Sequence, residues 1–254
     1  MRIALLYFSG TGNTKWLAET LATKLQEKGA KVDLFSLEDT VVLAPPYDTY
    51  LLAHPVYGAH VPRLVIDRVV ELIKGNIHLS VITTFGYVNA LGFFAEKKAL
   101  GREIDAYYNV KMFNNISTPA LKVPIKVLEQ RLQSKEKIEA RIDVIADAII
   151  NDKSRIEGIG PQLIVGIRIR KMMNEKLHSY YQTLGVDPDR CTRCNLCIRE
   201  CPTHSIVEKD GNFIFHATCT TCTRCYNICP TQAITIDGKY ADPEIYTRYL
   251  GPWK

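Results

Sequence analysis

The sequence predicts an α/β protein in which a doubly wound parallel sheet is followed by a small α+β module. Short apolar runs alternate with helical patterns over residues 1–150, and a glycine-rich loop follows the first run. All eight cysteines of the 254 residues lie between positions 191 and 229. Alternating strands and helices indicate a parallel sheet with helices on both faces. The confined cysteines indicate a second unit with its own chemistry.

The apolar run of residues 3–8 is typical of a strand buried on both faces of a sheet, and four further segments are predicted to be strands. We expect these strands at residues 3–8, 31–35, 49–53, 79–84 and 106–112. Helical periodicity predicts a helix that ends at Gly29 and further helices over 62–73, 91–104 and 123–150. Pro62 suits a first helical turn. The long third pattern rests on an apolar stripe of Leu128, Leu132, Ile142, Ile145 and Ile149.

The loop after the first expected strand is rich in hydroxyl groups and glycine. A strand that runs into such a loop and then into a helix is typical of an anion site, where backbone N–H groups face the anion. The chain has no G-x-x-x-x-G-K-[ST] and no G-x-G-x-x-G motif, which argues against a triphosphate or dinucleotide site. The loop therefore predicts a site for the phosphate of a mononucleotide, formed by Ser9, Gly10, Thr11, Gly12, Asn13 and Thr14.

The pattern Ser-x-Thr-Gly-x-Thr of this loop resembles the phosphate loop of flavodoxins, and the resemblance covers residues 1–150. It implies FMN as cofactor and the strand order 2-1-3-4-5, with the ligand at the carboxyl ends of strands one, three and four. It also implies that the loops after strands three and four bracket the isoalloxazine ring. Tyr57 would stack on the ring, and Gly58 and Ala59 would offer backbone groups near N5. The ring residues it implies are Pro55, Val56, Tyr57, Gly58, Thr84, Phe85, Gly86 and Tyr87.

His54 and residues 114–116 also lie near the expected strand ends, but no role in flavin binding is assigned to them. His54 is expected to be a histidine whose hydrogen bonds are satisfied near a strand end. Residues 114–116, after the fifth strand, show no distinctive pattern and are left without a function.

The cysteines form two runs of C-x2-C-x2-C-x3-C-P that repeat with a period of 28 residues. The likeness continues beyond them, since CPTHSIVEKDG is followed by CPTQAITIDGK, which indicates an internal duplication. In this spacing three thiolates surround one iron–sulfur cube and the fourth ligates the other cube. We therefore expect two [4Fe–4S] clusters, the first on Cys191, Cys194, Cys197 and Cys229, the second on Cys219, Cys222, Cys225 and Cys201.

Other uses of eight cysteines fit less well. A disulfide framework requires an oxidising compartment, and zinc sites favour a longer gap between paired cysteines. Residues 187–240 resemble the bacterial two-cluster ferredoxin, which implies a compact βαβ-βαβ module. We expect a flavodoxin-like domain at 1–150, a helical connector at 151–186, and the ferredoxin-like domain with a C-terminal tail at 187–254.

The connector combines an apolar stripe with basic residues such as Arg168 and Lys171. A helix that packs on one or both domains is the first interpretation. An interfacial membrane helix and a partner-docking surface are the alternatives.

Composition excludes some partners. The net charge of +5 is not gathered into a basic stripe with interleaved aromatics, so nucleic acid is not an expected partner. No apolar run approaches the length of a transmembrane helix, and the first residues fit a buried strand better than a signal peptide. These features predict a cytoplasmic protein.

The whole chain resembles the flavodoxin–ferredoxin fusion proteins of anaerobic bacteria and archaea. The resemblance implies an electron relay between the clusters and FMN, served by redox partner proteins that act as low-potential donor or acceptor. The alternative is an FMN-dependent reductase that acts on its own small-molecule substrate. A non-redox scaffold or sensor is a third possibility, against which the complete flavin loop argues. Transfer within one chain and transfer between the chains of a homodimer both remain open.

Overall fold

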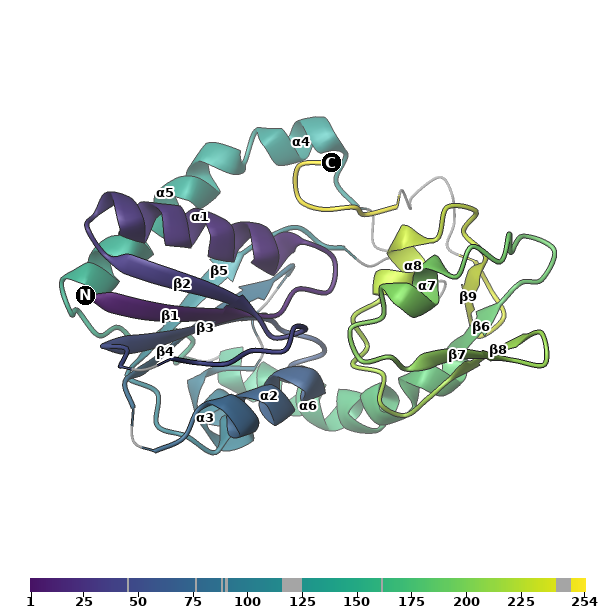
Figure 1. Cartoon of the computed structure of the whole chain (residues 1–254), viewed down its shortest axis with the longest axis horizontal. Helices are drawn as coiled ribbons and strands as arrows, with labels where there is room; N and C mark the ends of the chain where they lie inside the picture. The colour runs from purple at the N-terminus through teal and green to yellow at the C-terminus, as the bar shows by residue number, and fades with distance from the viewer. Residues whose placement is uncertain are drawn as a thin grey trace.

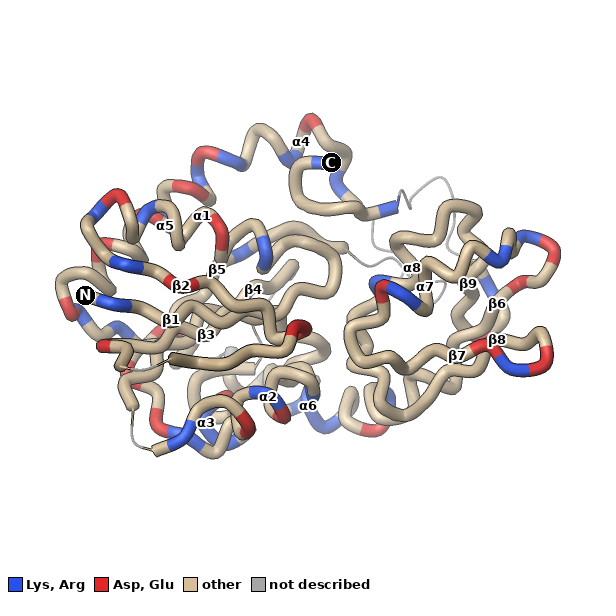
Figure 2. Tube along the Cα trace, viewed as in Figure 1, with Lys and Arg blue, Asp and Glu red and all other residues tan. Residues whose placement is uncertain are grey.

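The computed structural model describes residues 1–44, 46–75, 77–87, 89, 91–115, 125–160, 162–240 and 248–254. A larger part built on a sheet lies beside a smaller part that holds the cysteines, and the C-terminus returns to the larger part (Figure 1). Basic and acidic residues are interspersed over both parts (Figure 2).

The larger part has one parallel sheet of five strands in the order β2-β1-β3-β4-β5. This is the doubly wound, flavodoxin-like order that the sequence predicts. The strands are β1 Arg2–Tyr7, β2 Lys31–Ser36, β3 Thr49–Pro55, β4 Leu79–Phe85 and β5 Ala106–Lys111.

Helices cover both faces of the sheet (Figure 1). Because side chains alternate along a strand, Ile3 and Leu5 of β1 pack in one cluster with the first pair of helices, while Ala4 and Leu6 pack in another with the second pair. The first pair is α1 Asn13–Glu27 and α5 Lys135–Ile150, and the second is α2 Arg63–Leu72 and α3 Phe93–Leu100.

The expectation of one helix over 123–150 is wrong, and residues 123 and 124 lie outside the described part. The chain forms α4 Leu128–Leu132 and then α5, with a turn closed by the bond from Ser134 N–H to Arg131 O (2.9 Å). The two helices serve different partners. Ile142 of α5 packs on the sheet core, whereas Arg131 of α4 binds the C-terminal segment. A single straight helix would not serve both.

The smaller part repeats a strand–helix–strand unit, as the cysteine duplication predicts. Its strands pair antiparallel, β6 with β9 and β7 with β8. The elements are β6 Leu184–Val186, α7 Leu196–Arg199, β7 Ile206–Lys209, β8 Asn212–Phe215, α8 Arg224–Ile228 and β9 Ile234–Ile236.

The connector is helical: α6 Gln162–Ser179 and the 3-10 helix Tyr180–Thr183 run from beside α2 and α3 into the smaller part (Figure 1). Within the described residues, no helix has the length and apolar character needed to cross a membrane.

Candidate cofactor sites

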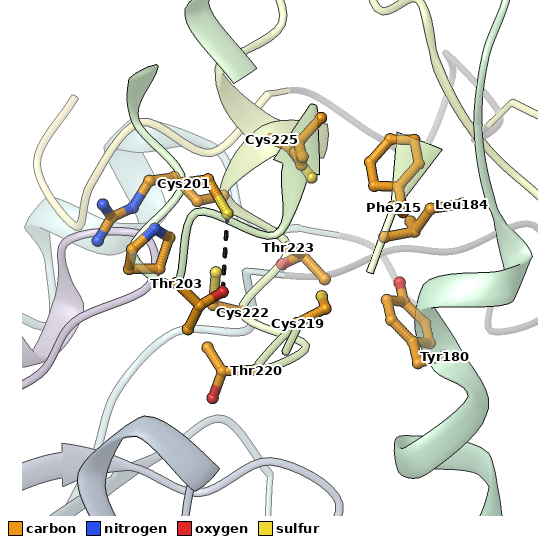
Figure 3. Close-up of a pocket in the computed structure, with 13 residues that line it drawn as sticks. Tyr180, Leu184, Cys201, Thr203, Phe215, Cys219, Thr220, Cys222, Thr223 and Cys225 are labelled. Atoms are coloured by element: carbon orange, nitrogen blue, oxygen red, sulfur yellow. Dashed lines mark hydrogen bonds between the residues drawn. The ribbon is translucent and has the colours of Figure 1, made fainter. Parts of the chain in front are cut away.

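The eight cysteines line two cavities, four to each. Cys201, Cys219, Cys222 and Cys225 surround one, and Cys191, Cys194, Cys197 and Cys229 surround the other. None of the eight forms a disulfide. Figure 3 shows the first cavity, with Tyr180 and Phe215 on the wall opposite Cys201. The fourth cysteine of each run thus lies with the first three of the other run.

The first cavity contains polar atoms that lack partners. Among the described residues, the buried hydroxyls of Tyr180 and Thr220 find no hydrogen-bond partner. An unmatched buried hydroxyl is unfavourable, and both of these residues line the cysteine cavity. Inorganic sulfides are acceptors that such hydroxyls could bind, so the cavity fits an iron–sulfur cluster.

The loops around the cysteines are held in left-handed backbone conformations at equivalent positions. These positions have φ of 54° and 57° at Arg193 and Thr221, 54° and 56° at Asn195 and Thr223, and 49° and 53° at His204 and Gln232. A left-handed residue other than glycine costs roughly 1–2 kcal/mol. Such strain persists where the surroundings hold the backbone, commonly around bound groups. The repeated strain is consistent with two loops shaped for the same ligand.

Backbone N–H groups point at the cysteine sulfurs. The amide of Ser205 donates to Cys201 Sγ at 3.3 Å, and that of Ala233 donates to Cys229 Sγ at 3.2 Å. The amide of Arg193 donates to Cys191 Sγ at 3.4 Å. Donors of this kind stabilise the thiolate, which is the form that binds metal.

Burial has the opposite effect on several thiols. It raises the pKa of Cys222 to about 12 and that of Cys197 to about 11, whereas the backbone N–H of Leu196 lowers the pKa of Cys194. A buried thiolate therefore needs a compensating positive charge, which iron supplies.

The predicted phosphate loop leads into α1 at the carboxyl end of β1. Gly12 precedes the helix with φ 102°, and no side chain caps the helix start. The first turn holds no acidic residue, so its N–H groups suit an anion. Ser9 Oγ accepts from Gly12 N–H (3.1 Å), and the hydroxyls of Thr14 and Thr84 lie 2.7 Å apart. The donor set fits a phosphate monoester.

The loop after β3 forms a tight turn. Tyr57 and His60 exchange backbone hydrogen bonds of 3.1 and 2.9 Å, with φ of 52° at Gly58 and 65° at Ala59 between them. Helix α6 packs on this turn. A Cβ on Gly58 would lie 3.1 Å from Met173 Cε, and Arg170 donates to Ala59 O at 3.3 Å. The connector thus covers one of the predicted ring loops.

The other predicted ring residues lie along the same edge. Val56 N–H donates to Thr84 O (2.9 Å), which joins the ends of β3 and β4 beside Pro55 and Phe85. Gly86 lies against Asn114, since a Cβ there would be 3.2 Å from Asn114 Cα. Tyr87 is 55% exposed.

Tyr57 points at the phosphate loop. A Cβ on Gly10 would overlap the Tyr57 hydroxyl and would lie 2.9 Å from Cys222 Cβ. Burial raises the pKa of this tyrosine well above its usual value. The phosphate loop, the first ring loop and a cysteine of the first cavity therefore meet at Gly10.

Arg224 joins the two parts at this point. Its guanidinium donates to the carbonyls of Ser9 and Gly10, each at 2.8 Å, and pairs with the Glu38 carboxylate at 2.5 Å. Arg224 has no predicted role from the sequence pattern. The sequence does mark this position, because the duplicated units differ there: the first unit has the apolar Leu196 where the second has Arg224.

Asn115 is a second contact residue to which the sequence pattern assigns no function. It donates to the Thr11 hydroxyl and accepts from Asn227 Nδ2 (3.3 Å) of the cysteine part. Its position after β5, at the carboxyl edge of the sheet, was the only available signal.

His54 is fully buried, and its hydrogen bonds are satisfied, as expected. Its ring nitrogens bond to Glu96 Oε1 (2.8 Å) and Pro55 O (3.0 Å). Burial by itself would lower the pKa of His54, but the Glu96 carboxylate outweighs it, so the pKa is raised.

Comparison with known proteins identifies the cysteine part. Residues 183–230 match a family described as a 4Fe-4S dicluster domain. The chain joins a flavodoxin-like sheet to a 4Fe–4S domain. No curated protein matches it.

Several solved flavodoxins are similar to the sheet domain, all at low identity. A short-chain flavodoxin associated with a PDU bacterial microcompartment is 13% identical, with a TM-score of 0.43 over 61% of this chain and 99% of its own. Flavodoxin 2 from Bacillus cereus is 16% identical, with a TM-score of 0.43 over 60% and 99%. Megasphaera elsdenii flavodoxin is 22% identical, with a TM-score of 0.36 over 42% and 84%. The fold assignment rests on this chain's own strand order.

Proposed function

We propose that the protein is an electron-transfer flavo-iron–sulfur protein that relays low-potential electrons between two [4Fe–4S] clusters and FMN. The contact at Gly10 carries this proposal, because it brings Cys222 of one quartet directly against the phosphate loop. Electron transfer requires cofactors that lie close together, and Tyr57 of the first predicted ring loop meets Cys222 at the same glycine.

In this proposal the cofactor-binding residues are assigned to the two clusters and to FMN as the sequence suggests. Each cavity holds one cluster on its four cysteines, residues 9–14 hold the FMN phosphate, and the loops around Tyr57 and Tyr87 hold the ring. When bound, the clusters exchange single electrons, and the flavin accepts one or two. The division into domains at 1–150, 151–186 and 187–254 follows this assignment.

Buried contacts around the proposed FMN site support electron transfer because they exclude water from it. Arg224 keeps the cysteine loop against Ser9 and Gly10, and Met173 of the connector covers Gly58. The quartet with the exposed Cys194 offers a surface to a redox partner protein. A cytoplasmic location suits clusters that need a reducing compartment.

A reductase with its own substrate would need a proton donor that faces the flavin ring. Four side chains near the predicted ring loops could serve as that donor: His54, Tyr57, His60 and Tyr87. Three of them are engaged elsewhere, His54 with Glu96, Tyr57 at Gly10, and His60 Nδ1 with Gly58 O at 2.8 Å, while Tyr87 is 55% exposed. These contacts favour the carrier over the reductase.

The first test is anaerobic purification followed by iron, sulfide and flavin analysis and an EPR-monitored redox titration. We expect about eight iron atoms, from two four-iron clusters, and about one FMN per chain. An iron content of about two atoms per chain, or zinc in place of iron, would contradict the proposal, since neither matches a four-iron cluster.

Rapid mixing with a one-electron reductant then tests the relay. Flavin reduction that follows cluster reduction at a rate independent of protein concentration supports transfer within one chain or one stable dimer. A rate proportional to concentration would show that the cofactors meet only between molecules.

A further inference from the structure

The last described residues form a segment, 248–254, that we call the C-terminal strap. It begins on helix α8, which contains Cys225 and ends directly before Cys229. Arg248 donates to the carbonyls of Asn227 (3.0 Å) and Ile228 (2.5 Å), and Tyr249 N–H donates to Asn227 Oδ1 (3.1 Å). The strap is thus attached to the cysteine part at its start.

Its end is attached to the sheet domain. Arg131 of α4, only 5% exposed, donates to the carbonyls of Gly251 (2.6 Å), Pro252 (3.2 Å) and Lys254 (2.7 Å). The Trp253 ring packs edge-on against the rings of Trp16 in α1 and Phe113, with 4.9 and 5.5 Å between ring centroids. Bonds at both ends therefore hold the strap across the two parts of the molecule.

Between these ends the strap contacts the phosphate loop. A Cβ on Gly12 would lie 3.2 Å from Gly251 Cα, so the two backbones are in direct contact. The Tyr249 hydroxyl donates to Asn13 Oδ1, while Asn13 Nδ2 donates to Phe113 O at 3.0 Å. Tyr249 is 1% exposed, so little water competes for this bond.

These bonds change the role of Asn13. Both polar atoms of its side chain are used within the protein, so this side chain does not face the ligand. Asn13 is the first residue of α1, where the backbone N–H is among those left for an anion. Fixing the side chain between Tyr249 and Phe113 fixes the orientation of that N–H.

We propose that Tyr249 is a positioning residue for the FMN phosphate, which acts by holding Asn13 and hence the first turn of α1. This inference rests on the proposed function. It predicts an effect specific to the phosphate monoester, because the strap contacts Gly12 and Asn13, whereas the ring loops lie at the ends of β3 and β4. Riboflavin, which has the ring but no phosphate, is the matched probe.

The test compares Tyr249→Phe with wild-type protein, both loaded with clusters and freed of flavin by dialysis. Flavin fluorescence gives the dissociation constants for FMN and for riboflavin. Loss of one hydrogen bond should weaken FMN binding about threefold to tenfold, with riboflavin binding unchanged. Tyr240→Phe is the control, since that ring packs on Arg190 and should leave both constants unchanged. Iron and sulfide contents should match the wild type in both variants.

A double variant checks the route through Asn13. If Tyr249 acts through Asn13, Tyr249→Phe should cause no further loss in an Asn13→Ala background. Equal weakening of FMN and riboflavin, or no weakening of FMN, would overturn the proposal. A wild-type protein that binds neither flavin would instead refute the proposed function.

Discussion

The two cysteine units have the same loops and opposite surroundings. Cys194 and Cys222 occupy equivalent positions 28 residues apart, yet Cys194 is exposed and Cys222 is buried against Gly10. Arg199 bonds within its own unit, to Cys194 O at 2.7 Å, whereas its counterpart Asn227 reaches Asn115 of the sheet domain. Duplication produced two matching loops, and docking on the sheet domain made them different.

Removing one cysteine from each unit should show the largest difference between the units, and the difference should be in FMN affinity. Cys194→Ala and Cys222→Ala should each lower iron from about eight to about four atoms per chain. Only Cys222→Ala should also weaken FMN, because Cys222 lies against the phosphate loop. Iron analysis and flavin titration of both variants measure this. Equal flavin losses would contradict the asymmetry.

Arg224→Leu gives the second unit the residue that the first unit has at Leu196. It leaves Glu38 half-buried without its cation, so we expect a loss of about 3 kcal/mol in stability. Denaturant unfolding, with proteolysis of the connector as a second measure, tests this.

Arg193→Ala is the matched control for that change. Its pair with Glu208 is exposed and should contribute less than about 1 kcal/mol. A loss as large as that of Arg224→Leu would mean that docking does not distinguish the two units.

Gly10→Ala tests how tightly the second unit packs. The added methyl would overlap the Tyr57 hydroxyl and press on Cys222, at an expected cost of about 1–3 kcal/mol. Adding Tyr57→Phe should restore part of this stability, because it removes one of the two overlaps. No rescue in the denaturation midpoint would show that Tyr57 does not fill this space.

The smallest expected effect is kinetic. The residues around a metal site control solvent access, so a chelator should remove iron in two phases. The fast phase, from the quartet with the exposed Cys194, should be at least about threefold faster than the slow phase. Cys194→Ala should retain only the slow phase, and Cys222→Ala only the fast one. Iron release followed by absorbance would reveal a single phase if the two quartets were equally protected.

Local sequence patterns were sufficient for the sheet and for the cysteine units. Most of the strands are short runs rich in apolar residues. The motifs Ser-x-Thr-Gly-x-Thr and C-x2-C-x2-C-x3-C are contiguous, so their geometry follows from a few neighbouring residues. The helix break at Ser134 could not be predicted in this way, since it depends on Arg131 binding carbonyls more than a hundred residues away.

The resemblance carried by the phosphate-loop motif implied the order of the strands, which the structure confirms. That the loops after β3 and β4 hold a flavin ring stays a prediction. Which cysteine unit faces the sheet, and the roles of Arg224, Asn115 and Tyr249, depended on the tertiary structure. An arginine, an asparagine and a tyrosine are ordinary surface or core residues until a distant carbonyl or amide comes within hydrogen-bond range. Contacts between segments far apart in the chain produce no periodic pattern in the local sequence. The residues that make them come together only when the chain folds.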